Sequence, residues 1–126
     1  MYPADLRYTQ DHIWLRQEDE SKGRLGLTFY GQDQLKKVVF VDLPKVGTEV
    51  RQQEAFGSIE SRKALVDLYS PVTGTVVEVN HLLETEPGWV NQEPYGKGWM
   101  IALALADPAQ IDGLLTADKY QALITP

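Results

Sequence analysis

Lys63 is the residue of this chain whose setting points most clearly to chemistry, because it lies in a polar turn between two runs rich in β-branched, aromatic and aliphatic residues. The turn reads Glu60-Ser61-Arg62-Lys63-Ala64, and Asp67 lies in the second run. A further turn, Ser70-Pro71-Val72-Thr73-Gly74, then leads into another strand. A lysine in this position projects its amine into solvent, and the pattern is typical of an attachment-site hairpin.

The other residues that could do chemistry do not form a catalytic set. His12 and His81 are far apart in the sequence, and the chain has no cysteine, so neither a metal site nor a thiol nucleophile is expected. Ser61 lacks a base with an orienting partner. We expect His12, beside Trp14, to be a half-buried strand residue. The sequence therefore predicts a binding protein and not an enzyme.

Composition limits the partners and the number of domains. With 126 residues and 43% hydrophobic content, the chain can bury one modest core, so residues 1–126 are expected to form a single domain. Twelve basic against eighteen acidic residues give a net charge of −6, which argues against nucleic acid or an anionic membrane surface as the main partner. The opening Met1-Tyr2-Pro3-Ala4-Asp5 lacks the features of a signal peptide, so a cytoplasmic location is expected.

The elements that must position Lys63 are mostly short strands. Two strands at 12–16 and 24–27, joined by a turn at 20–23, are expected to form a hairpin, and Thr28 can cap a short helix that runs to Lys37. The further strands are expected at 38–41, 54–59, 65–69, 75–79 and 99–104. The core is expected to include Ile59, Leu68, Val77, Val79 and Trp99.

The C-terminal part of the chain predicts two helices. Asp107-Pro108-Ala109-Gln110 has the order of a capping box with proline at the first helical position, for a helix that runs to Leu115. Thr116 can cap a second helix, whose apolar face would hold Tyr120, Leu123 and Ile124.

Together with 39–44, Val-Phe-Val-Asp-Leu-Pro, and 90–99, the Lys63 segment resembles the lipoyl-carrying H protein of the glycine cleavage system. The resemblance runs from Tyr8 to Leu123. It implies a lipoyl/biotinyl-type barrel-sandwich hybrid, mainly β with flanking short helices, including a C-terminal helical segment. Segments 47–50 and 74–77 echo each other, which fits the quasi-two-fold symmetry of that fold.

The same resemblance implies a cofactor site. Lipoic acid would be attached covalently to Lys63, with Glu60, Ser61, Arg62, Ala64 and Asp67 around it, and Asp67 matches a carboxylate that pairs with the amine of the cargo. Biotin carriers fit less well, because their lysine has methionine on both sides, where this chain has Arg62 and Ala64. The implied partners are a lipoate ligase or lipoyl transferase and dihydrolipoyl dehydrogenase.

Departures from the family pattern bear on the pathway. Ile13 replaces a glutamate expected near the amine, Gln34 replaces a histidine, and Lys36-Lys37 and Arg62 add positive charge. This favours the H-like lipoate-binding proteins of sulfur oxidation, which work with a heterodisulfide-reductase-like complex. Glycine cleavage, with glycine decarboxylase and aminomethyltransferase as partners, is the alternative, and a lipoyl-relay protein is a third. Neutral drift at exposed positions would explain the same substitutions.

Overall fold

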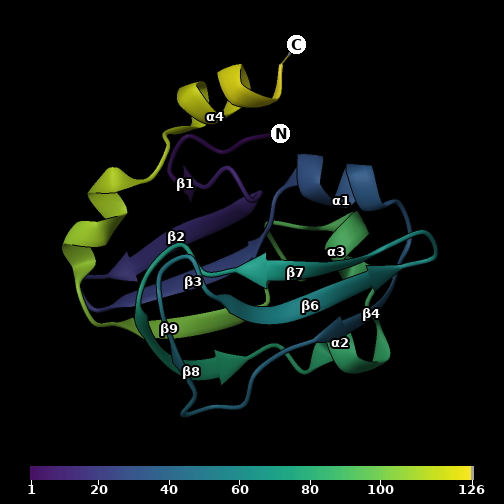
Figure 1. Ribbon diagram of the computed structural model, residues 1–126, viewed down its shortest axis with the longest axis horizontal. Helices are drawn as coiled ribbons and strands as arrows, with labels where there is room; N and C mark the ends of the chain where they lie inside the picture. The colour runs from purple at the N-terminus through teal and green to yellow at the C-terminus, as the bar shows by residue number, and fades with distance from the viewer. Residues whose placement is uncertain (126) are drawn as a thin grey trace.

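The computed structural model describes residues 1–125 and is built mainly from β-strands with short helices, as expected (Figure 1). The strands are β1 Arg7–Tyr8, β2 Ile13–Asp19, β3 Lys22–Leu27, β4 Val38–Asp42, β5 Glu49–Val50, β6 Ala55–Ser61, β7 Leu65–Tyr69, β8 Gly74–Val79 and β9 Ile101–Leu105. The helices are α1 Phe29–Leu35, α2 Leu82–Thr85, α3 Trp89–Gln92, the 3₁₀ helix η1 Pro108–Gly113 and α4 Ala117–Ile124.

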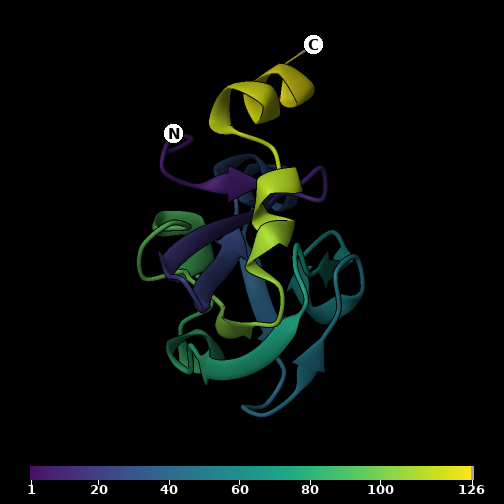
Figure 2. The same ribbon diagram turned by 90° about the vertical axis from the view of Figure 1, so that its left-hand side faces the viewer.

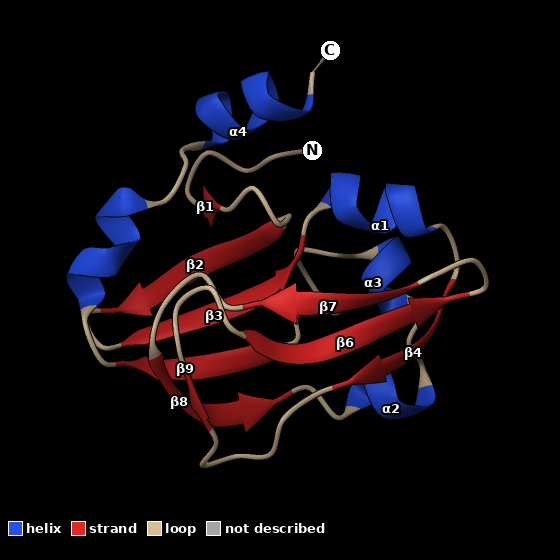
Figure 3. Ribbon diagram, viewed as in Figure 1, coloured by secondary structure: helices blue, strands red, loops and turns tan. Residues whose placement is uncertain are grey.

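The strands form two antiparallel sheets (Figure 3). The larger sheet has the order β1-β2-β3-β9-β8-β5, and the smaller sheet has the order β4-β6-β7. The hairpin of β6 and β7 reaches one end of the molecule, close to the C-terminal end of α1 (Figure 1). This hairpin carries the Lys63 turn.

One apolar core joins the two sheets. Ile59 of β6 and Leu68 of β7 are buried in it, as predicted, together with residues of β2, β3 and β9. The prediction for Val77 is wrong, because its side chain is 40% exposed. The pairing of β8 with β9 shifts between Val76 and Glu78, so this irregularity turns Val77 outward while Val76 stays in the core. Val79 and Trp99 are only partly buried.

Leu68 offers a direct test of this register. We expect Leu68→Ala to lower the free energy of unfolding by about 2 to 5 kcal/mol, because the truncation leaves a cavity in the shared core. Val77→Ala at its exposed position should cost less than about 0.5 kcal/mol. Urea unfolding of both variants measures the difference, and equal stabilities would show that the register of the hairpin is off by one.

The two echoing segments lie side by side. Glu49 pairs with Thr75 and Val50 with Gly74 in an antiparallel ladder, and the Val76 backbone exchanges hydrogen bonds with Gly47 and Thr48. The ladder therefore relates the segments by a local two-fold axis.

Two helix ends differ from the prediction. Helix α1 ends at Leu35 because Lys36 has a φ of 65°, which cannot continue a helix. The capping box after Asp107 does not form: Asp107 accepts from the Ala109 backbone, and Gln110 instead bonds to the Thr73 backbone at 2.8 Å. The result is the 3₁₀ helix η1, which ends at Gly113 and not at Leu115.

Helix α4 begins at the predicted cap, Thr116, which accepts from the Lys119 backbone. Its buried residues are Ala117 and Tyr120, whereas Leu123, predicted for the same face, is 52% exposed. Tyr120 stacks on Tyr8 at a ring-centroid distance of 4.9 Å. Figure 2 shows α4 at the end of the molecule where the N-terminal segment lies. None of the helices within residues 1–125 is long and apolar enough to cross a membrane.

Candidate functional site

The turn that carries Lys63 is held by its own hydrogen bonds. The Ser61 hydroxyl accepts from the backbone N–H groups of Lys63 at 3.3 Å and Ala64 at 3.2 Å, and the Ser61 N–H donates to the Ala64 carbonyl at 2.9 Å. These bonds fix the backbone on both sides of Lys63, whose side chain is exposed. The turn therefore presents a free amine on a rigid support.

The other residues predicted around a cofactor take different positions. Glu60 and Arg62 are exposed, and Ala64 packs partly against the core. Ser61 is 4% exposed, and its hydroxyl accepts from backbone N–H groups of the turn; its place beside a cofactor stays a prediction. Asp67 is exposed on β7 and lines a pocket.

That pocket, of about 310 Å³, lies between α1 and the β6–β7 hairpin. Its walls are mainly apolar, and its polar side chains come from three separate segments. The apolar residues are Leu27, Leu35, Ile59, Val66 and Leu68, and the polar ones are Asp11, His12, Tyr30, Gln34 and Asp67. The pocket thus combines apolar surface with two carboxylates that lie far apart in the sequence.

Asp11 was not predicted from the sequence, and it changes the interpretation of Ile13. Ile13 is fully buried in the core and does not line the pocket, so it is not an exposed position free to drift. Asp11, two residues earlier, lines the pocket together with Asp67. The pocket therefore has two carboxylates although position 13 is apolar, and the argument from Ile13 for a cargo without an amine loses its basis.

His12 does not lie in a strand, contrary to the prediction. It precedes β2 in a left-handed conformation, with a φ of 69°, and it is half-buried, as predicted. Burial lowers the pKa of its imidazole. Helix α1 approaches it closely through Gly31, where a Cβ atom would lie 3.1 Å from the Cβ of His12 and 2.6 Å from a Leu27 methyl carbon.

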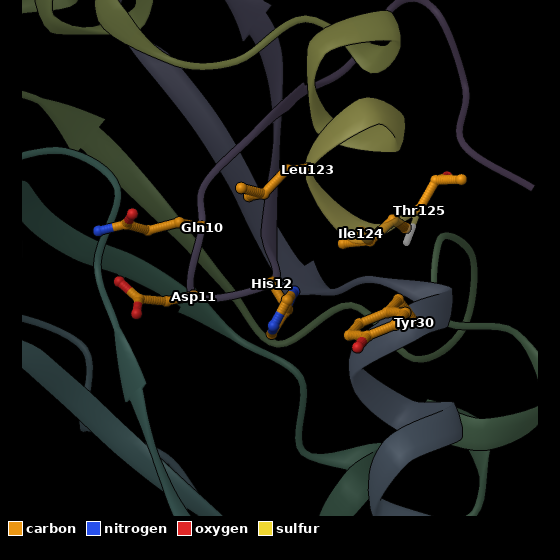
Figure 4. Close-up of a pocket in the computed structure, with 7 residues that line it drawn as sticks. All are labelled: Gln10, Asp11, His12, Tyr30, Leu123, Ile124 and Thr125. Carbon is orange, nitrogen blue, oxygen red and sulfur yellow. The ribbon is translucent and has the colours of Figure 1, made fainter.

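A second and larger pocket, of about 650 Å³, lies against α4 and shares Asp11, His12 and Tyr30 with the first (Figure 4). Its other lining residues are Gln10, Leu123, Ile124 and Thr125. We assign the site to the first pocket, because only that pocket is also lined by the Lys63 hairpin.

Positive charge gathers at the tip of the hairpin, as the sequence suggested. Val38 pairs with Ser61, so Lys36-Lys37 and Arg62-Lys63 leave the smaller sheet at the same end. Lys36 lies 3.7 Å from Asp33, whose carboxylate offsets part of this charge.

The comparisons with known proteins agree with one another. The family model described as "Glycine cleavage H-protein" matches residues 6–126. The chain is 52% identical to the "Glycine cleavage system H protein" of Symbiobacterium thermophilum, over 95% of this chain and 93% of that protein. It is 51% identical to the protein of the same name from Geobacillus kaustophilus, over 97% and 95% of the two chains.

A comparison with solved structures also points to glycine cleavage H proteins. The crystal structure of a glycine cleavage system H protein from Mycobacterium marinum matches with a TM-score of 0.87 and 34% identity, over 95% of this chain and 96% of that one. This confirms the predicted barrel-sandwich fold with its flanking helices. Matches of this extent show that the chain belongs to the glycine cleavage H-protein family, whose members are non-catalytic carriers of lipoic acid bound covalently to a lysine.

Proposed function

We propose that this chain is the lipoyl carrier of a glycine cleavage system, with lipoic acid in amide linkage on Lys63. The observation that carries the proposal is the exposed Lys63 amine, on a hairpin that also forms one wall of a pocket with two carboxylates. Bound lipoic acid would supply the sulfur that accepts an aminomethyl cargo from glycine decarboxylase and gives it up to aminomethyltransferase. A lipoate ligase or lipoyl transferase would attach it, and dihydrolipoyl dehydrogenase would reoxidise the dithiol.

The chain's own residues suit this role without catalysing the chemistry. Ser61 fixes the turn, so the exposed Lys63 side chain would extend from a backbone that is held in place. A tethered group has a high effective concentration at any enzyme to which the carrier docks, so weak docking is sufficient. Residues 1–126 would act as a single domain in the cytoplasm; both of these points stay predictions.

The pocket suits an amine at the end of an apolar chain. Its apolar wall, which includes the 41% exposed Val66, offers surface to a hydrocarbon arm and excludes water from it. Asp11 and Asp67 offer carboxylates to an ammonium group, and such charge-assisted hydrogen bonds are stronger than neutral ones. The pocket would therefore protect an amine cargo between visits to the partner enzymes.

The carboxylates can be tested one at a time. We expect Asp11→Asn and Asp67→Asn each to speed the spontaneous release of formaldehyde from the loaded protein by about two- to fivefold, because each removes one partner of the ammonium group while water still screens the site. The release rate is measured on the purified loaded protein. Asp112→Asn, at an exposed position outside the pocket, is the matched control and should release at the wild-type rate. Unchanged rates in both pocket variants would show that the carboxylates do not hold the cargo.

The sulfur-oxidation interpretation receives no support from the relatives, which are named glycine cleavage system H proteins. Its remaining arguments are Gln34, which lines the pocket, and the positive charge of Lys36, Lys37 and Arg62. A reconstituted system separates the two pathways. With the three partner enzymes of glycine cleavage, the lipoylated protein should support glycine consumption at a rate near that of the Bacillus subtilis H protein, a 47% identical relative. A fully lipoylated protein without turnover would overturn the proposal.

A further inference from the structure

A line of hydrogen bonds runs from the start of α1 to His12. The Gly31 N–H donates to the Thr28 hydroxyl at 3.1 Å, the Thr28 hydroxyl lies 2.8 Å from the Tyr120 hydroxyl, and the Tyr120 hydroxyl lies 2.7 Å from Nδ1 of His12. Thr28 and Tyr120 are fully buried. The line therefore connects α1, α4 and the loop before β2 away from solvent.

The donors in this line can be assigned by counting protons. Within residues 1–125, the Thr28 hydroxyl oxygen has two partners, Gly31 N–H and the Tyr120 oxygen, and the first can only donate. The Thr28 proton must then go to Tyr120, since a buried hydroxyl without an acceptor is costly. The single proton of Tyr120 is left for Nδ1 of His12.

This order fixes the state of the imidazole. Nδ1 of His12 accepts from Tyr120, so the ring proton of neutral His12 is on Nε2. Figure 4 shows the other ring nitrogen of His12 pointing away from the helix that carries Leu123 and Ile124. Burial lowers the pKa of His12. The hydrogen bond from Tyr120 acts in the same direction, because a second ring proton, on Nδ1, would face the Tyr120 hydroxyl and force the donors of the line to reverse.

The backbone of His12 is held equally firmly. Its N–H donates to the Thr9 carbonyl at 3.1 Å, and its carbonyl accepts from the Thr28 N–H at 2.9 Å. These bonds maintain the left-handed φ of 69°, which costs a non-glycine residue free energy. The ring is therefore held from both sides, at the wall that the two pockets share.

We propose that Tyr120 is a positioning residue of the arm site: through Thr28 and its own hydroxyl, it holds His12 as the neutral tautomer that carries its proton on Nε2, available as a donor to the cargo or sulfur of a lipoyl arm in the pocket. This rests on the proposed function for the identity of the ligand. Helix α4, which is remote from Lys63 in the sequence, would thus control the orientation of His12, a side chain that lines the site. The other titratable groups around His12 are Asp11 beside it, Tyr30 at a ring distance of 4.8 Å, and Asp67 across the pocket.

The first test needs no cofactor. Nitrogen NMR of the unlipoylated protein should show neutral His12 protonated on Nε2, and Tyr120→Phe should raise the pKa of His12 by about half a pH unit to one pH unit and mix its tautomers, because the donor to Nδ1 is lost. Tyr8→Phe removes a hydroxyl of the same aromatic cluster, which bonds to the Pro3 carbonyl, and should leave His12 unchanged. His81, exposed and next to Glu84, serves as an internal reference in every spectrum.

An Nδ1–H tautomer in the wild type, or a His12 titration indifferent to Tyr120→Phe, would overturn the assignment whatever the protein carries. The second test asks whether the ring matters to the arm. Tyr120→Phe should speed release from the loaded protein by about two- to twelvefold, and Tyr8→Phe should not. A changed titration with unchanged release would overturn the positioning role. If the reconstituted system did not consume glycine but NMR still showed the predicted His12 tautomer, the proposed function would be wrong and the assignment of Tyr120 would stand.

Discussion

Replacing Lys63 with arginine is expected to abolish lipoylation completely. Lipoic acid can be joined to the chain only through an amine that forms an amide, and a guanidinium cannot replace that amine. After incubation with a lipoate ligase and lipoate, the wild type should gain the mass of one lipoyl amide, and Lys63→Arg should gain none. The variant keeps the positive charge and the exposed position, so the turn held by Ser61 should remain intact.

Lys45→Arg is the matched control, because Lys45 is also an exposed lysine but lies in the loop between β4 and β5. It should be lipoylated like the wild type. Modification that persists in Lys63→Arg, or is lost in Lys45→Arg, would move the attachment site away from the β6–β7 turn.

The second large effect concerns Ile13, where the family pattern leads one to expect a glutamate. We expect Ile13→Glu to lower the free energy of unfolding by about 3 to 5 kcal/mol at neutral pH, because the side chain at this position is fully buried among apolar residues and an unpaired carboxylate would be desolvated there. Urea unfolding measures the loss. The loss should shrink as the pH falls toward the pKa of the buried carboxyl, since the protonated form is less costly to bury.

Val77→Glu introduces the same charge at an exposed position of β8 and should cost less than about 0.5 kcal/mol. Equal stabilities of the two variants would show that the side chain at position 13 is not buried in the core, and Ile13 would again count as an exposed position.

Local signals in the sequence predicted much of the fold. Thr28 and Thr116 cap helices as expected, because the interaction of a hydroxyl with the next turn depends on only a few neighbouring residues. The strand positions followed from runs of β-branched and aromatic residues. The confirmed family membership rests on motifs spread along the whole chain.

The features that were missed depend on contacts between distant segments. The outward turn of Val77 follows from its pairing with β9, and the loss of the capping box follows from the bond of Gln110 to the Thr73 backbone. The pocket brings together Asp11, Gln34 and Asp67, whose proximity no sequence spacing indicates. The strand predicted at 12–16 starts one residue later in the structure, because hydrogen bonds to Thr9 and Thr28 hold His12 in a loop. The role of Lys63 itself stays a prediction.

The group that the lipoyl arm accepts distinguishes glycine cleavage from sulfur oxidation most directly. The lipoylated protein is incubated with glycine decarboxylase and glycine labelled at the α-carbon. The masses of the intact chain and of its peptides are then measured by mass spectrometry. If Lys63 carries the lipoyl arm of glycine cleavage, each chain should gain one labelled aminomethyl group on the peptide that contains Lys63, and Lys63→Arg should gain none. A fully lipoylated chain that takes no label from glycine, but takes up sulfur from a persulfide donor, would contradict this role.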